Sequence, residues 1–342
     1  MIMSIKAKRI LKKIVSWAGL FFFILAAGVL YWQLRKHSLM DIARALYHIP
    51  LHNLIYACIA CLCGYIALSF YDFLALRYVK KTVSWWKWML AGIISFAVSN
   101  NAGHAVVSGG AIRYRLYTRW RIQAGDIVKM LAFSGFTYFL GCAAIVILGY
   151  FLVPHNMFEQ SVSAKVGING LFIFCTAALG AYFALSVFFR NKNIRIGNTK
   201  FQVPNTETAA VQTFLGAADS ILAGLVLYFC LEPFLKIPFS TYIGLFVIAQ
   251  TAGVFSQVPG GIGVFETVFM FALPESTDPA KIFGALLAYR IIYYVLPLIG
   301  AGGLFFIYER WMRNRMKRWL EEAKALKEKL PKFIKAQKKI QQ

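Results

Sequence analysis

Four ionisable residues lie inside long apolar stretches of this sequence: Asp72, Asp219, Glu266 and Arg290. A charge inside hydrocarbon costs roughly 3 kcal/mol or more unless another charge or water compensates it, so each is a candidate functional position. A guanidinium such as that of Arg290 can hold a phosphate with two parallel hydrogen bonds. It can equally be a structural partner of Glu266. The sequence leaves both roles open.

Two further apolar blocks, 88–107 and 242–273, are interrupted by polar residues, glycine or proline. Glycine and proline together stop a helix, and irregular backbone at membrane depth persists only where protein or a water-filled cavity surrounds it. A helix that begins at such a break presents backbone N–H groups and a positive dipole end to an anion. We expect breaks at Ser108-Gly109-Gly110 and between Gln257 and Gly263. The segment 261–266 is expected to form the start of a half-helix.

The candidate binding residues combine the intramembrane charges with polar and glycine positions at the expected breaks. His104 is the one histidine placed near a break, and lining a polar turn is its more ordinary role. All six cysteines lie in apolar blocks, and the Cys58/Cys61 pair is on an apolar helix without nearby His or acid partners, so we expect packing residues and no metal site. We expect no cofactor. The candidate substrate-binding set is Asp72, Asn100, Gly109, Gly110, Arg113, Asp219, Gly260, Gly261, Glu266 and Arg290.

Long apolar blocks must position these residues. The chain has 342 residues, of which 59% are hydrophobic. Blocks of about twenty residues have the length that a helix needs to cross roughly 30 Å of hydrocarbon. The first block follows a basic segment, 1–13, and is too long for a signal peptide, so we expect an uncleaved span. Six uninterrupted blocks are predicted to span: 14–34, 51–76, 127–153, 168–189, 209–231 and 282–308.

The distribution of basic residues predicts the orientation. The net charge of +23 indicates membrane orientation and anionic lipid rather than nucleic acid. If both interrupted blocks are re-entrant hairpins, the segments on one side hold 30 of the 37 Lys and Arg residues. That side is then the cytoplasm, and both termini lie there. The predicted cytoplasmic segments are 1–13, 77–87, 113–129, 190–207 and 309–342.

The same plan occurs twice in the chain. A span that contains an aspartate precedes a broken block, and a long span follows, in repeat 51–153 and again in repeat 209–308. The charges orient the two units oppositely, which is typical of transporters with a midplane binding site. The predicted fold is an all-α polytopic membrane protein with about six spanning helices and two re-entrant hairpins in an inverted repeat. The membrane domain is 14–308, and the basic tail, 309–342, is predicted to lie on the inner leaflet as an amphipathic helix.

Four stretches of the sequence carry a recognisable pattern. They are 71–77 (YDFLALR), 99–116 with its SN and GGAIRYRL elements, 259–266 (PGGIGVFE), and Tyr289-Arg290 with Tyr293, Tyr294 and Pro297. These stretches resemble one known family, the membrane region of lysylphosphatidylglycerol synthases (multiple peptide resistance factors) and its stand-alone relatives. The resemblance covers roughly residues 10–310, and its most specific element is Pro-Gly-Gly-x-Gly-x-x-Glu.

The resemblance implies a flippase that moves aminoacylated phosphatidylglycerol between leaflets of the bacterial cytoplasmic membrane. In that family a separate soluble domain attaches the amino acid. The 34 residues after Tyr308 are too few for such a domain, so we do not expect synthase activity in this chain. Membrane phospholipids are the expected partners, together with a separate lipid-modifying enzyme.

Three classes of function remain open. The leading hypothesis is translocation of an anionic or aminoacylated phospholipid, or of another lipid-linked headgroup. A membrane-embedded transferase, or an accessory subunit of one, is the alternative, although the sequence has no nucleophile–base pair and no metal-ligand spacing. A scaffold protein would have no need of the intramembrane charges.

Overall fold

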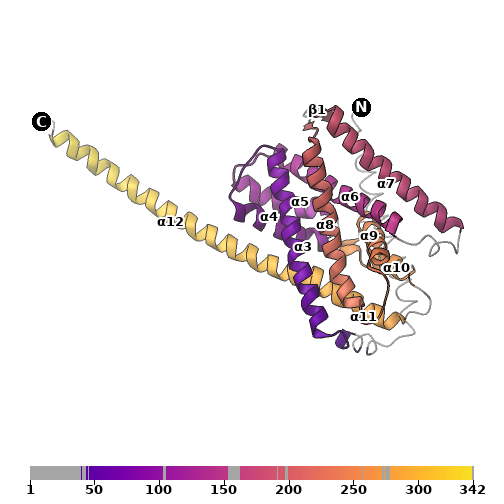
Figure 1. Ribbon diagram of the computed structural model, residues 1–342. Helices are drawn as coiled ribbons and strands as arrows, with labels where there is room; N and C mark the ends of the chain where they lie inside the picture. Colours follow the sequence, from indigo (N-terminus) through magenta and orange to yellow (C-terminus); the bar gives the residue numbers. More distant parts are fainter. Residues whose placement is uncertain are drawn as a thin grey trace, which may run out of the picture. The chain divides into compact units, whose positions relative to one another are not determined.

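The computed structural model describes Met40, Arg44 and residues 46–102, 105–152, 162–190, 192–196, 199–256, 258–271, 273 and 278–340. The chain divides into two units, Met1–Leu298 and Ile299–Gln342. The described part is α-helical apart from one two-stranded hairpin (Figure 1). Its elements are α3 (Leu51–Tyr78), α4 (Trp85–Ala102), α5 (Ala105–Arg119), α6 (Ala124–Leu152), α7 (Val162–Phe188), β1 (Asn193–Ile196), β2 (Thr199–Gln202), α8 (Thr206–Leu231), α9 (Phe239–Phe255), the 3₁₀ turn η2 (Pro259–Gly261), α10 (Val264–Phe271), α11 (Pro279–Arg290), the π-helical turn η3 (Ile291–Val295) and α12 (Leu296–Ile340).

Five helices in the described residues are long and apolar enough to cross a membrane. Four of them are formed by α3, α6, α7 and α8, and the fifth is Pro279–Arg318, which runs from α11 through η3 into α12. These spans confirm the five uninterrupted blocks predicted after residue 50. The block 14–34 lies outside the described residues. The protein is therefore an all-α, multi-pass membrane protein.

Helices α3 and α8 pack side by side in opposite directions (Figure 1). At one end, the Asn53 side chain at the start of α3 donates a hydrogen bond to the Phe229 carbonyl near the end of α8, at 2.8 Å. At the other end, the Tyr78 hydroxyl donates to the Gln202 carbonyl just before α8, also at 2.8 Å. The two helices that open the predicted repeats are thus antiparallel.

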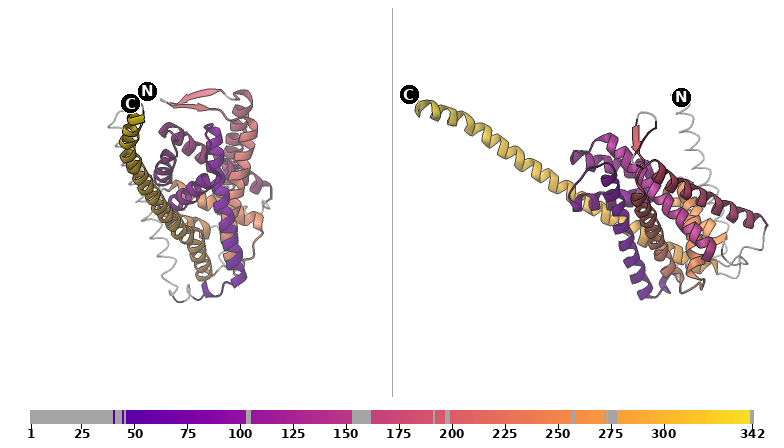
Figure 2. Two further views of the ribbon diagram at one scale, coloured as in Figure 1. Left: turned by 90° about the vertical axis from the view of Figure 1, so that its left-hand side faces the viewer. Right: turned by 45° about the horizontal axis from the view of Figure 1, so that its top comes forward.

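A helical hairpin follows each of these two helices. In the first, α4 and α5 pack together, and the rings of Trp86 and Trp120 lie 6.3 Å apart at its open end. In the second, α9 and α10 pack together, and the rings of Tyr242 and Phe269 lie 6.0 Å apart at its open end. Each hairpin therefore returns to the end from which it starts. Figure 2 shows these helices from two further directions.

The closed ends of the two hairpins meet. A Cβ atom added to Gly260 in the second tip would lie 3.7 Å from the carbonyl oxygen of Asn100 in the first. Because α3 and α8 are antiparallel, the hairpins reach this junction from opposite ends of the bundle. In the second tip the non-helical backbone of Gly261 and Gly263 is buried against protein, as a helix break inside a membrane bundle requires.

The predicted position of the first break is wrong. Gly109 and Gly110 are helical residues of α5, and the change from α4 to α5 falls between Ala102 and Ala105. A Cβ atom on Gly109 would lie 1.9 Å from the Ser99 hydroxyl oxygen, so this glycine lets α5 pack closely on α4. Gly109 therefore serves helix packing and does not end the helix.

The second break lies where the sequence predicts it. Helix α9 ends at Phe255, η2 follows, and α10 begins at Val264. Gly260, Gly261 and Gly263 have φ angles of 61°, 62° and 85°. Side-chain-bearing residues rarely adopt this left-handed region, which accounts for the glycine-rich sequence of the turn.

Two glycines let the repeats contact each other closely. A Cβ atom on Gly141 of α6 would lie 2.0 Å from the Gly216 carbonyl carbon of α8. A Cβ atom on Gly216 would lie 2.1 Å from the Thr137 carbonyl oxygen. Small residues at such a crossing bring two membrane helices into backbone contact.

Candidate functional site

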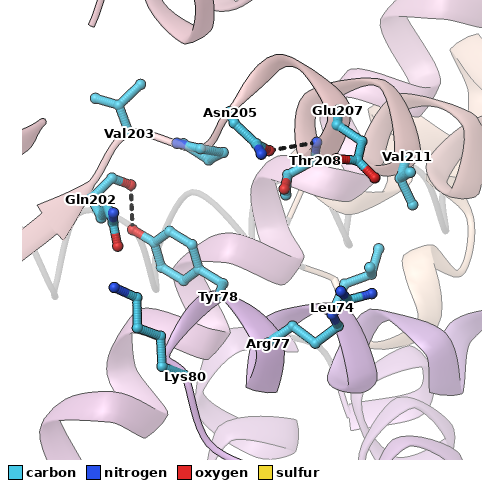
Figure 3. Close-up of a pocket in the computed structure, with 11 residues that line it drawn as sticks. Leu74, Arg77, Tyr78, Lys80, Gln202, Val203, Asn205, Glu207, Thr208 and Val211 are labelled. Carbon is cyan, nitrogen blue, oxygen red and sulfur yellow. Dashed lines mark hydrogen bonds between the residues drawn. The ribbon is translucent and has the colours of Figure 1, made fainter. Parts of the chain in front are cut away.

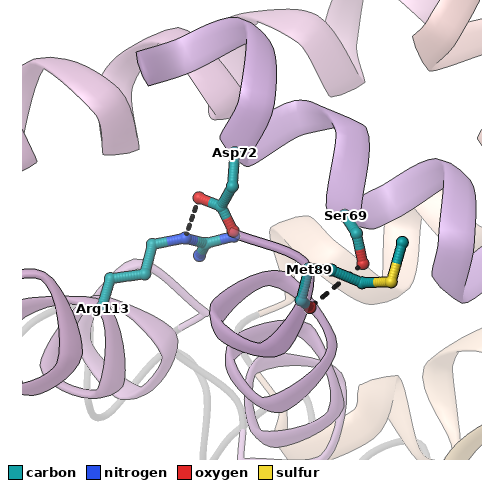
Figure 4. Close-up of polar contacts among 4 residues, drawn as sticks. All are labelled: Ser69, Asp72, Met89 and Arg113. Carbon is teal, nitrogen blue, oxygen red and sulfur yellow. Dashed lines mark hydrogen bonds and ion pairs between the residues drawn. The ribbon is translucent and has the colours of Figure 1, made fainter. Parts of the chain in front are cut away.

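A buried ion pair anchors the first hairpin to α3 (Figure 4). The Arg113 Nε atom donates to Oδ1 of Asp72 at 2.8 Å, and its Nη2 atom donates to Oδ2 at 3.1 Å. The Asp72 side chain is fully buried and that of Arg113 is 4% exposed. The guanidinium carbon also lies 4.4 Å from the centre of the Phe96 ring. This two-bond geometry neutralises both charges inside the bundle.

Close packing of α3 on α4 brings Asp72 within reach of α5. The Ser69 hydroxyl donates to the Tyr65 carbonyl at 2.8 Å and to the Met89 carbonyl of α4 at 3.4 Å, the second of which Figure 4 shows. A Cβ atom on Gly92 would lie 2.7 Å from the Ser69 Cα atom, so glycine is required at this crossing.

The partnership of Asp72 with Arg113 was missed by the sequence analysis, which placed Arg113 at the start of a cytoplasmic segment, 113–129. In the structure Arg113 is a buried residue of α5, which continues to Arg119, and its side chain faces Asp72 inside the bundle. The signal was present: a lone aspartate in a span needs a cation, and an arginine close to the next break is a natural donor.

A second ion pair closes the tip of the second hairpin. The Arg290 Nε atom donates to Oε1 of Glu266 at 2.7 Å, and Arg290 Nη1 donates to the Gly260 carbonyl. Glu266 Oε2 accepts the backbone N–H of Gly263 at 2.7 Å, as the third residue of a helix does in a capping box. The side chains of Arg290 and Glu266 are 13% and 8% exposed.

Aromatic rings hold the Arg290 guanidinium in place. Its central carbon lies 4.6 Å from the ring centre of Tyr294 and 5.5 Å from that of Phe265. Rings on these sides attract the cation and restrict where its N–H groups point. The sequence left two roles open for Arg290, phosphate binding and pairing with Glu266. The structure contains the pair with Glu266.

The first tip is bonded to the last span. The Asn101 side-chain amide donates to the Tyr294 carbonyl at 3.1 Å, and the Asn100 amide donates to the Tyr65 hydroxyl at 3.4 Å. The Tyr65 hydroxyl in turn donates to the Tyr293 carbonyl at 3.2 Å. The carbonyls of Tyr293 and Tyr294 belong to the π-helical turn η3, whose wider winding is often found at functional sites.

Asp219 differs from the other two intramembrane acids. Its Oδ2 atom accepts a hydrogen bond from the Tyr71 hydroxyl at 3.1 Å. Its Oδ1 atom is buried and has no hydrogen-bond partner in the described part of the chain. The structure therefore does not join Asp219 to either ion pair directly.

Apart from Asp219, the sequence-predicted site residues fall into three groups. Asn100, Gly260, Gly261, Glu266 and Arg290 gather at the meeting tips, whereas Asp72 and Arg113 form the separate anchor pair. Gly109 and Gly110 contribute packing inside α5. His104 lies outside the described residues. Among the residues that are described, no group of three His, Cys, Asp or Glu side chains is arranged to hold a metal ion.

The structure also contains a basic groove that was not predicted from the sequence. It has a volume of about 490 Å³ and lies between the end of α3 and the start of α8 (Figure 3). Arg77, Tyr78, Lys80 and Glu207 line it. A smaller recess of about 210 Å³ shares Tyr78 and Lys80 and adds basic residues from α6 and β2. The signal for it was the clustering of Lys and Arg in 77–87 and 190–207.

Comparisons with known proteins agree with this architecture. The family model "Lysylphosphatidylglycerol synthase TM region" matches residues 16–301. The uncharacterized protein slr0712 of Synechocystis sp. is 32% identical over 302 residues, which is 88% of this chain and 93% of that protein. Inner membrane protein YbhN of Escherichia coli is 27% identical over 297 residues, which is 85% of this chain and 90% of that protein.

Phosphatidylglycerol lysyltransferase of Staphylococcus aureus (strain MRSA252) is 24% identical over 239 residues, which is 68% of this chain. The match covers 27% of the lysyltransferase, so the chain spans only about a quarter of that relative. The family model, in contrast, covers most of the described helical bundle. The chain belongs to the family of the lysylphosphatidylglycerol synthase transmembrane region.

Proposed function

We propose that this protein moves a phospholipid, or another lipid with a phosphate-linked headgroup, between the leaflets of the bacterial cytoplasmic membrane. Membership of its family supports a role related to membrane lipid modification. The observation that carries the proposal is the junction of two opposed helical hairpins, with an arginine–carboxylate pair at the tip of one. Discontinuous helices that meet inside a bundle are the usual architecture of a transporter's midplane site.

The basic groove supports an orientation with this end of the bundle in the cytoplasm. Lys80 and Lys129 line the same recess as Lys200 of the β-hairpin, so basic residues from separate segments converge at one end. Excess Lys and Arg is typical of cytoplasmic ends. On this proposal both termini are cytoplasmic. Arg77 and Lys80 then attract an anionic headgroup at the inner leaflet, since each basic residue near such a surface contributes about 1 kcal/mol.

The two ion pairs have different proposed roles because they differ in burial. Asp72 has no exposed surface, so its pair with Arg113 locks the first hairpin to α3. Arg290 keeps 13% of its side chain exposed at the tip junction. A lipid phosphate is an oxyanion with the geometry to replace Glu266 as the partner of the guanidinium. Glu266 is then available to a cationic headgroup such as an aminoacyl ester.

Lipid movement by purified protein in vesicles tests this function. A fluorescent phosphatidylglycerol analogue is placed in both leaflets, and a membrane-impermeant reductant bleaches the molecules that reach the outside. Arg290→Lys keeps the charge but loses the planar fork, and a charge-assisted hydrogen bond contributes about 1.5–3 kcal/mol. The rate of lipid movement should therefore fall by roughly 10- to 100-fold. Arg290→Ala should be slower still.

Arg195→Lys is the matched control, because Arg195 lies exposed on β1, away from the tips. It should move lipid at the wild-type rate. The charge-swapped variant Glu266→Arg/Arg290→Glu restores an ion pair but moves the cation. Full recovery of lipid movement in that variant would show that the pair only joins helices and would refute phosphate binding by Arg290. Equal bleaching in vesicles with and without wild-type protein would refute the proposed function.

A further inference from the structure

The most unusual buried group in the bundle is the carboxyl group of Asp219. Asp72 and Glu266 each contact an arginine. In the described residues Asp219 has no basic partner, and its side chain accepts one hydrogen bond, from Tyr71. Its other oxygen is buried and unpartnered. The residue as a whole is 4% exposed.

The groups that face Asp219 are neutral at physiological pH. Tyr65 and Tyr71 face it from α3, and Tyr293 faces it from η3. On the α6 side are Tyr138 and Cys142, with Thr251 of α9 beside them. The Cys142 sulfur lies 3.8 Å from the hydroxyl oxygen of Ser220, the residue after Asp219. None of the described Lys, Arg or His residues compensates an ionised Asp219.

An isolated carboxylate in such surroundings is strongly disfavoured, because neither water nor a cation balances its charge. A bound proton removes that charge and leaves the hydrogen bond from Tyr71 intact, since Oδ2 accepts in either form. Ionisation becomes favourable only when water or a cation reaches the unpartnered oxygen. The protonation state of Asp219 should therefore follow the opening and closing of the bundle.

A chain of contacts connects Asp219 to the first hairpin. The Tyr71 ring, whose hydroxyl bonds Asp219, packs edge-on against the Phe96 ring of α4 with centres 5.5 Å apart. The central carbon of the Arg113 guanidinium lies 4.4 Å from the centre of the same Phe96 ring. Tyr71 also precedes Asp72, the partner of Arg113, on α3. Tyr71 and Phe96 thus connect Asp219 to the Arg113 side chain, so a change in the protonation of Asp219 can affect the ion pair that holds the first hairpin to α3.

We propose that Asp219 binds a proton inside the membrane and releases it during the transport cycle, so that lipid movement is coupled to proton movement. This coupling rests on the proposed function. The carboxylate takes up a proton on Oδ1 as the bundle closes and releases it to water when the bundle opens. The ionised carboxylate then attracts water and accepts a stronger hydrogen bond from Tyr71, which alters the contact of Tyr71 with Phe96.

Infrared spectroscopy tests proton binding independently of lipid transport. Wild-type protein in lipid nanodiscs should show the stretching band of a protonated carboxyl group at neutral pH. Asp219→Asn should lose this band, and Asp126→Asn, which changes an acid on the α6 surface, should keep it. If Asp219→Asn does not fold, Asp219→Glu should shift the band. The same spectrum in wild type and in a folded Asp219 variant would overturn the proposal, as would loss of the band on adding sodium ions alone.

Vesicles with an imposed pH difference test the coupling. The rate of lipid movement in wild type should depend on that difference, and the dependence should disappear in Asp219→Asn but persist in Asp126→Asn. An unchanged dependence in Asp219→Asn would overturn coupling through Asp219. If wild-type protein moves no lipid under any gradient, the proposed function fails and the coupling with it, while the infrared band still decides whether Asp219 holds a proton.

Discussion

Replacing Arg113 with methionine removes one member of the buried pair and leaves Asp72 without a partner. Because the carboxylate is fully buried, the loss is that of an uncompensated internal charge, about 3–5 kcal/mol. The contact of the guanidinium with Phe96 contributes about 0.5–2 kcal/mol more. Arg113→Met should therefore lower the free energy of unfolding by at least about 3 kcal/mol.

The double variant Asp72→Leu/Arg113→Met separates the charge from the packing. Two apolar side chains of similar volume leave no buried charge, and such replacements are often close to neutral. The double variant should regain most of the stability that Arg113→Met loses. Denaturation of purified protein by sodium dodecyl sulfate, followed by circular dichroism and tryptophan fluorescence, measures the three free energies.

Lys129→Met provides the control for this experiment. Lys129 pairs with Asp126 at 3.3 Å near the start of α6, but the two side chains are 29% and 16% exposed. Loss of such a pair on a helix surface costs about 0.5 kcal/mol or less. If Arg113→Met is as mild as Lys129→Met, or if the double variant is as unstable as Arg113→Met, the anchor role of the pair is refuted.

Three other perturbations have definite outcomes. Gly261→Ala places a Cβ atom on a residue with left-handed backbone and within 3.0 Å of the Gly253 Cα atom, so it should destabilise the protein by about 1–2 kcal/mol. Gly135→Ala is the control, because there is open space around Gly135. Thermal unfolding in detergent should show a lower melting temperature for Gly261→Ala and an unchanged one for Gly135→Ala. With the proposed orientation, a membrane-impermeant thiol reagent should label Lys236→Cys but not Arg121→Cys in intact cells, and external labelling at 121 would contradict it. Truncation after Arg310 should slow lipid movement while the remaining helices stay folded; loss of folded protein on truncation would exclude a peripheral role for the tail.

The sequence predicts the spanning helices well because hydrocarbon thickness imposes a simple rule on length and composition. The predicted block 51–76 corresponds to α3, Leu51–Tyr78, and the block 209–231 to α8, Thr206–Leu231. The β-hairpin was not predicted, although polar and apolar residues alternate over 193–196 just before Gly197-Asn198 in the sequence. A strand of four residues is too short for its sequence pattern to be distinguished from that of a loop between long apolar helices.

Parts of the site that depend on local backbone conformation could be predicted from the sequence, whereas contacts between distant helices could not. The Pro259–Gly263 turn could be predicted because several positive φ angles require glycine. The first break could not be predicted from Gly109, because glycine also permits close helix packing and the partner, Ser99, is known only from the fold. The pairing of Asp72 with Arg113 and the isolation of Asp219 likewise depend on which helices become neighbours.

The glycine crossing of α6 and α8 holds the two repeats in backbone contact at one point. With backbone against backbone at Gly141 and Gly216, no side chain can change rotamer to let these helices slide past each other. We therefore expect any motion between the repeats to pivot about this crossing, so that a small tilt here gives larger displacements farther along the two helices.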